Sequence, residues 1–255
     1  MFVRFTVLLA ATTVASAPVT VQYRIEQKVE SKVDLSGFGQ GEQVQNQNAL
    51  WHLTITYSDS AGGQVMHAVL DSARIEGMLP IPQATLDSVK GTAFHGFLDA
   101  ESRLKSLTAS RTGTLVTQFE SALRLLHPSV KRGAGAGATW SDTLDISTKT
   151  PEANLQSNTV RNFTMGGAEA WQGSQATKIN VATVTKVSGS LETPGGTAEM
   201  LGGGPGTGAY YLSPDGRLAG ATSSSLTEAI VTLAAAPGPI PVKTTTTTTV
   251  SILKP

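Results

Sequence analysis

Four histidines are the side chains in this 255-residue chain that are best suited to bind a metal ion or to transfer a proton near neutral pH. His52, His67, His95 and His127 form neither an H-x-x-x-H nor an H-E-x-x-H pair, the spacings that place two ligands on one face of a helix. His67 and Asp71 are four residues apart, but on a strand this spacing separates the two side chains by about 13 Å. The sequence therefore predicts no catalytic, metal-binding or cofactor-binding residues.

Two arginines could contact an anionic group. Arg103 and Arg217 occupy equivalent positions in two similar segments, and each follows a turn that contains an acid, Glu101 or Asp215. They can be interpreted as solvated strand residues or as contacts for a bound anion. The remaining acids that could act in proton transfer fall mostly in turns or at strand starts, where acids usually accept local hydrogen bonds. These acids are Asp59, Asp99, Asp142 and Asp145.

Two short sequence patterns resemble functional motifs. The glycine-rich residues 202–208, GGGPGTG, could cradle a phosphate, but no Lys-Ser or Lys-Thr pair follows and a strand rather than a helix comes next. They are interpreted as a flexible connection within a sheet. Asn162-Phe163-Thr164 matches an acceptor pattern for glycosylation, which is frequent by chance. The nucleophile pattern G-x-S-x-G does not occur.

The elements that must position these residues are mostly strands. Residues 208–222, GAYYLSPDGRLAGAT, predict a hairpin, because Pro214 presets φ in the turn and Gly216 tolerates a positive φ. Residues 97–110, FLDAESRLKSLTAS, repeat the same order of aromatic, Leu, acid, Arg-Leu and Thr. The repetition suggests two related β-units in one chain.

Alternation of apolar and polar residues predicts further strands at residues 20–33, 51–57 and 64–75. The Gly-, Gln- and Asn-rich residues 36–48 between the first two are predicted to be a loop. In the second half, strands are predicted at 139–147, 160–165, 176–187 and 226–235, with a weak hairpin at 188–204. The final strand, residues 241–253, contains six consecutive threonines and is predicted to pair antiparallel with 226–235.

One segment predicts a clear helix. Thr114–Leu126 carries an apolar stripe at helical spacing, and Pro128 prevents its extension. The stripe favours packing on a sheet; a helix lying on a membrane surface is the alternative. A shorter helix is predicted at residues 83–90. Residues 131–138, KRGAGAGA, are predicted to be a flexible connector between two halves of the chain.

Composition and the N-terminus bear on location. Residues 1–17 combine one charge, a short apolar stretch and Ala15-Ser16-Ala17, which predicts a secretory signal peptide. Removing it takes Arg4 from 19 basic and 19 acidic residues, leaving a net charge of about −1. The sequence contains no basic patch with interleaved aromatic residues, so nucleic-acid binding is not predicted. No apolar run reaches the length of a membrane-spanning helix. A single β-rich domain is expected over 18–255, in halves of about 18–132 and 139–255.

A resemblance adds to this interpretation. Three features, LRLLHPSVKRGAGAGATWSDTL, TVRNFTMGGAEAWQGSQATKI and AYYLSPDGRL before a Thr-rich end, resemble a group of exported bacterial β-rich proteins of uncharacterised function. More loosely, many strands with one covering helix are similar in fold to the half-barrel lipoprotein carriers of the bacterial envelope. The resemblance implies an exported protein, periplasmic or extracellular, and assigns a role to no residue.

The predicted fold class is mainly β (β-rich α+β): a large antiparallel sheet or half-barrel from two β-units, with one covering amphipathic helix. Three functions stay open. The first is a non-enzymatic envelope protein that holds an apolar or amphipathic, lipid-like ligand in a sheet concavity; its ligand-binding residues are unknown. The second is a structural or protein–protein interaction module that uses exposed edges such as residues 244–253, with an envelope protein as partner. The third is an enzyme whose site is assembled by the fold.

Overall fold

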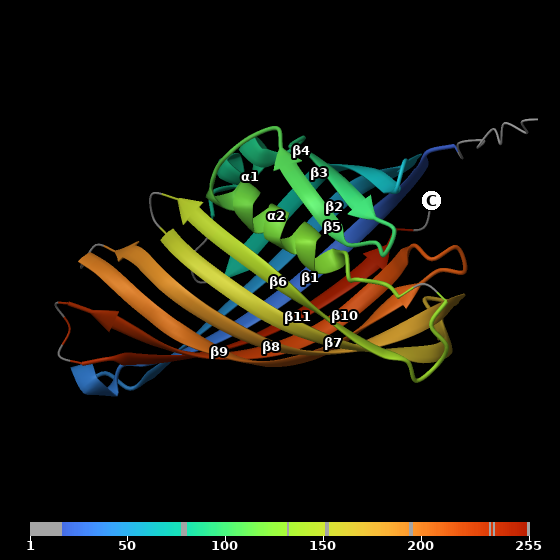
Figure 1. The fold of residues 1–255 in the computed structure, drawn as a ribbon. Helices are drawn as coiled ribbons and strands as arrows, with labels where there is room; N and C mark the ends of the chain where they lie inside the picture. The colour runs from blue at the N-terminus through green and yellow to red at the C-terminus, as the bar shows by residue number, and fades with distance from the viewer. Residues whose placement is uncertain are drawn as a thin grey trace, which may run out of the picture.

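The computed structural model describes residues 17–77, 81–131, 133–150, 153–193, 196–234, 236 and 238–253. The predicted signal peptide lies outside these ranges, except for Ala17. Within them the chain is mainly β, and one continuous antiparallel sheet of eleven strands curls into a half-barrel (Figure 1). The predicted fold class is confirmed.

The strands follow the order β5-β4-β3-β2-β1-β11-β10-β9-β8-β7-β6 across the sheet. The N-terminal half supplies β1–β5 and the C-terminal half β6–β11, and the two halves are hydrogen-bonded to each other through β1 and β11. The strand bounds are β1 Val19–Asp34, β2 Glu42–Ser60, β3 Gly63–Gly77, β4 Ala93–Asp99, β5 Leu104–Ala109, β6 Thr139–Thr150, β7 Ala153–Trp171, β8 Ser174–Thr193, β9 Gly196–Leu212, β10 Leu218–Leu233 and β11 Ile240–Ile252.

The C-terminal strand lies in the middle of the sheet. β11 pairs antiparallel with β10, where Thr244 lies opposite Thr227, and with β1, where Thr244 lies opposite Ser31. The predicted pairing with the preceding strand is confirmed, and the threonine run contributes backbone hydrogen bonds to two ladders. The suggestion that residues 244–253 form a free edge is wrong, because β1 pairs with that side. The edge strands are β5 and β6.

Two segments predicted as connections are strands. β2 begins at Glu42, opposite Asp34 of β1, so only the first part of residues 36–48 is a loop, with a short 3-10 helix at Ser36–Phe38. Residues 42–48 are mostly exposed, and their polar composition concealed a strand that pairs with the second half of β1. The glycine-rich residues 202–208 lie inside β9 and are not a flexible connection.

Close backbone approach explains these glycines. A Cβ at Gly202 or Gly204 would collide with the carbonyl oxygen of Glu228 or Leu226 on the neighbouring β10. Only glycine avoids this overlap, so β9 follows the curvature of the sheet where a strand with side chains would be pushed away from its neighbour.

Two helices accompany the sheet, α1 Gln83–Val89 and α2 Thr114–Leu126, both as predicted. α2 lies across the concave side of the sheet (Figure 1) and buries Val116, Phe119 and Leu123. The Phe119 ring meets Trp51 of β2 edge-on, with 5.0 Å between ring centroids. The predicted packing of the apolar stripe on the sheet is thereby confirmed. In the described part of the chain, neither helix has the length and apolar character needed to cross a bilayer.

Candidate functional site

A hollow lies between α2 and the inner face of the sheet, the face on which Trp51 contacts the helix. It is a cavity of about 260 Å³, slightly below the roughly 300–1,000 Å³ typical of ligand pockets. Its helix wall consists of Ala122, Leu125 and Leu126. The other walls come from β1, β2 and β6–β11, so both halves of the chain contribute to it.

Strand register arranges the inner face in rows that change from apolar to polar. Residues directly opposite one another on paired strands share a face, and successive rows lie about 7 Å apart along the strands. The row next to α2 is apolar, the second is mixed, and the third is largely polar. In order, the rows are Met165, Ile179, Tyr210, Ala221, Val250, Ile25 and Trp51; Phe163, Val181, Gly208, Ser223, Thr248, Gln27 and Ala49; and Arg161, Thr183, Gly206, Ser225, Thr246, Val29 and Gln47.

The glycines of β9 shape the floor of this hollow. Gly208 stands in the second row, between Val181 of β8 and Ser223 of β10. Gly206 stands in the third row, between Thr183 and Ser225. Because these two residues have no side chains, the middle of the inner face is bare backbone. The glycine-rich residues 202–208, which the sequence pattern indicates as a flexible connection, therefore keep space open beneath α2.

Arg161 of β7 and Asp142 of β6 form a buried ion pair in the wall of the hollow. Arg161 Nε donates to Asp142 Oδ1 at 2.7 Å, and Nη2 donates to Oδ2 at 2.8 Å, a bidentate geometry. The two side chains are 5% and 8% exposed. The third guanidinium nitrogen, Nη1, is also buried and makes no hydrogen bond to any described residue. This open donor is notable because buried charges usually have complete hydrogen bonding.

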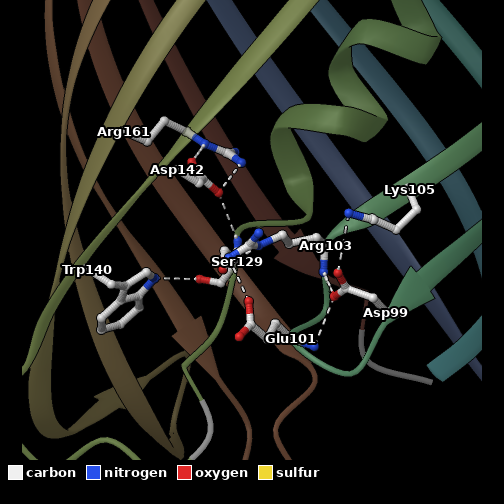
Figure 2. Close-up of polar contacts among 8 residues, drawn as sticks. All are labelled: Asp99, Glu101, Arg103, Lys105, Ser129, Trp140, Asp142 and Arg161. Carbon is white, nitrogen blue, oxygen red and sulfur yellow. Dashed lines mark hydrogen bonds and ion pairs between the residues drawn. The ribbon is translucent and has the colours of Figure 1, made fainter. Parts of the chain in front are cut away.

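Ser129, just after α2, links this ion pair to the β4–β5 turn (Figure 2). Its N–H donates to Asp142 Oδ2 at 3.4 Å, its hydroxyl accepts from Arg103 Nε at 2.9 Å, and its carbonyl accepts from Trp140 Nε1 at 2.9 Å. Arg103 also pairs with Glu101 at 2.6 Å. The network joins the edge regions of β5 and β6, which do not pair with each other, and so braces the open side of the half-barrel.

Hydrogen bonds hold the C-terminal end of α2 on the sheet. Tyr210 Oη donates to the Leu125 carbonyl at 2.9 Å, and His127 Nδ1 donates to the Leu123 carbonyl at 2.8 Å. A carbonyl can only accept, so the proton is assigned to Nδ1, and Nε2 accepts from Tyr57 Oη at 3.2 Å. Burial lowers the pKa of His127 and raises the pKa of Tyr57, so both groups stay neutral near pH 7.

The neutral His127 predicts a loss of stability in acid. Its pKa in the folded protein lies below the usual value of about 6.5. As the pH falls through 6.5 the unfolded chain takes up a proton that the folded protein does not, so the free energy of unfolding decreases by up to about 1.4 kcal/mol per pH unit. Urea melts across this range should show a shallower decrease for His127→Gln. Equal slopes for both proteins would contradict the assignment.

The other histidines do not gather into a site. His52 Nδ1 lies 2.8 Å from Ser72 Oγ, and the His67 and His95 rings lie 4.7 Å apart across β3 and β4. Strand parity places this pair on the face opposite the hollow. Among the described residues, no group of three or more His, Cys, Asp or Glu side chains is placed to hold a metal ion.

Arg103 and Arg217 occupy equivalent turns, as the repeat predicted. In each turn the residue four before the arginine donates its backbone N–H to the carbonyl of the arginine: Asp99 N donates to Arg103 O at 3.0 Å, and Ser213 N donates to Arg217 O at 2.8 Å. Arg103 pairs with Glu101 and Arg217 pairs with Asp215, the acid of its own turn. Arg217 holds the pKa of Asp215 at about 2. These local ion pairs favour the structural interpretation over an anion contact.

The remaining predicted acids mostly serve local geometry. Asp99 Oδ1 accepts from the backbone N–H groups of Glu101 and Arg103, and Asp145 Oδ1 accepts from Asn158 at 2.6 Å. Asp59 Oδ1 accepts from Gln64 at 3.2 Å. Asn162 of the glycosylation pattern is exposed on the outer face of β7.

Asp142 is the exception among the acids, and its partner Arg161 was not singled out in the sequence. A signal for both is visible in strand parity. Arg161 shares a face with Phe163 and Met165, and Asp142 shares a face with Trp140 and Leu144, so each is a charge on an apolar face. Two opposite charges placed in this way on successive strands indicate a buried pair.

Comparison with known proteins leaves the family open. No protein-family model matches the chain, and no curated protein matches it significantly. The argument for function therefore rests on the hollow itself.

Proposed function

We propose that this is an exported, non-enzymatic envelope protein, periplasmic or extracellular, that holds an amphipathic lipid-like ligand in the hollow beneath α2. The observation that carries the proposal is the hollow, which an apolar row and the helix enclose at one end and hydroxyl-bearing rows line at the other. A ligand with an acyl chain and a polar group matches this change of polarity. The chain would lie against Trp51, Val250 and Leu126.

The half-barrel shape supports the proposal in a limited way. A curled sheet with a helix in its concavity agrees with the fold-level similarity to lipoprotein carriers that the sequence suggested. A shared fold does not establish a shared function. The similarity therefore adds to the hollow as an argument and does not replace it.

Partner binding at a sheet edge is a second candidate. β6 is an edge strand of twelve residues, long enough to pair with a strand of another protein. The Ser129 network lies against this strand and contacts Asp142 and Trp140. Binding of a strand at β6 should leave the hollow free, so a lipid titration separates this function from the first.

Binding in the hollow can be followed through Trp51, one of three tryptophans. In a Trp140→Phe/Trp171→Phe background, Trp51 is the only fluorophore of its kind. Titration with a dibrominated stearoyl glycerol should quench it saturably at one equivalent, because bromine quenches indole fluorescence only at near-contact distance. An unquenched Trp51 up to the solubility limit of the lipid would contradict the proposed function.

Export requires its own test. If residues 1–17 are a signal peptide, the protein recovered from the periplasm or medium of a bacterial host should begin within a few residues of Pro18. N-terminal sequencing measures this directly. Recovery of the protein with an intact Met1 in the soluble cytoplasmic fraction would show that residues 1–17 are not removed.

A further inference from the structure

Charged side chains avoid most of the inner face of the sheet. Successive residues of a strand point to opposite faces, so the register assigns each side chain to the inner or the outer face. In β1 and β8–β11, all of which the structure describes in full, every charged residue lies on the outer face. These residues are Arg24, Glu26, Lys28, Glu30, Lys32, Asp34, Lys178, Lys186, Glu192, Glu199, Glu228 and Lys243. The inner face that these five strands give to the hollow is therefore uncharged.

The ion pair of β6 and β7 does not change this. Asp142 binds the Arg161 guanidinium through two hydrogen bonds, so the pair is neutral as a whole. The guanidinium lies against Tyr210 and near His127, at the end of α2. It is thus enclosed by its own partners and offers no counter-charge to a ligand in the hollow.

Hydroxyl groups take the place of charges on this inner face. The third row contains Thr183, Ser225 and Thr246, and all three line the hollow. Thr183 Oγ1 lies 2.5 Å from the position that a Cβ on Gly206 would take, so this hydroxyl leans over the glycine toward the middle of the face. The next row continues the pattern with Thr159, Thr185, Gly204, Thr227, Thr244, Ser31 and Gln45.

Exposure distinguishes these hydroxyls from those on the outside of the sheet. Thr244 and Thr246 are half-buried on the concave side, whereas Thr245 and Thr247 are exposed on the outer face. A charged group that entered the concave side would lose water and find no counter-charge, which is unfavourable. A hydroxyl can both donate and accept a hydrogen bond, so these rows can bind the hydroxyls of a polyol in either direction.

We infer that the ligand is a lipid with an uncharged, polyhydroxylated headgroup, such as a glycosyl or glyceryl group, and that the hydroxyls of Thr183, Ser225 and Thr246 bind this headgroup. The inference rests on the proposed function and names its ligand class. The chain of the lipid lies beneath α2, and the headgroup lies over the glycines of β9.

Three lipids that share a dodecyl chain and differ in headgroup charge test the inference. They are dodecyl maltoside, dodecyl phosphate and dodecyltrimethylammonium, each titrated calorimetrically into the mature protein below its micelle concentration. The maltoside should bind at least tenfold more tightly than either charged lipid. Equal affinities, or a preference for a charged lipid, would overturn the inference and leave the proposed function intact. Binding of none of the three would instead overturn the proposed function.

Free maltose separates a lipid headgroup from a free sugar as the source of the polyol. Maltose lacks the chain that packs beneath α2, so it should bind at least a hundredfold more weakly than dodecyl maltoside. Maltose that binds as tightly as dodecyl maltoside would show a saccharide site and would overturn the inference of a lipid.

Two double variants locate the headgroup. Thr183→Val/Thr246→Val removes two inner hydroxyls and keeps the shape of both side chains. It should lower the affinity for dodecyl maltoside about tenfold, the value of two hydrogen bonds, and leave the affinity for dodecyl phosphate unchanged. Thr245→Val/Thr247→Val makes the same change on the outer face and should bind as the wild type does. An equal loss for maltoside and phosphate in the inner variant would show that these threonines do not recognise the headgroup.

Discussion

Arg161→Met is expected to lower the free energy of unfolding by about 3–5 kcal/mol, because it leaves the Asp142 carboxylate buried without its partner. Asp142 of β6 also accepts from the Ser129 N–H, so losing its two hydrogen bonds to Arg161 weakens the attachment of the Ser129 network to β6. Denaturant melts followed by circular dichroism measure the loss.

Two comparisons separate the buried pair from charge in general. Adding Asp142→Leu to Arg161→Met should restore most of the stability, since no unpaired charge is then left in the interior. Arg217→Met removes a pair whose side chains are 32% and 48% exposed, and exposed pairs contribute about 0–1 kcal/mol. If Arg161→Met cost no more than Arg217→Met, the pair would not be buried in solution.

Phe119→Ala should cost about 3–5 kcal/mol, because Phe119 is fully buried at the centre of the α2 stripe and packs on Trp51. Leu125→Ala on the same helix is the matched control. Leu125 is 44% exposed at the wall of the hollow, so its truncation should cost less than about 1 kcal/mol. A loss under about 1 kcal/mol for Phe119→Ala in urea melts would mean that α2 is not docked on the sheet.

Patterns within short stretches of the sequence predicted the elements that are decided by contacts between residues close together in the chain. The stripe of Thr114–Leu126 gave the helix and its buried face, and the two Arg-containing turns gave matching hairpins, with positive φ at Ser102 and Gly216. The pairing of the threonine strand with β10 followed from the short turn between them. In each case the contacts that decide the structure lie close together in the sequence.

Features that depend on distant pairing were not predictable in this way. β1 and β11 join the ends of the chain, and this contact places the threonine strand at the centre of the sheet. This pairing gives β1 a second neighbouring strand, but nothing in the composition of β1 or β11 indicates that the two strands pair. Residues 42–48 and the glycines of β9 look like connections because their strand character comes from neighbouring strands. The hollow depends on all of these pairings together.

The most direct test of a ligand-filled hollow compares two phenylalanine substitutions on adjacent threonines of β11. Thr248 points into the hollow, whereas Thr247 is exposed on the outer face. Titration with the dibrominated stearoyl glycerol should show at least a tenfold loss of affinity for Thr248→Phe, whose ring fills the cavity, and wild-type affinity for Thr247→Phe. Wild-type affinity in both variants, with both folded, would contradict a ligand site beneath α2.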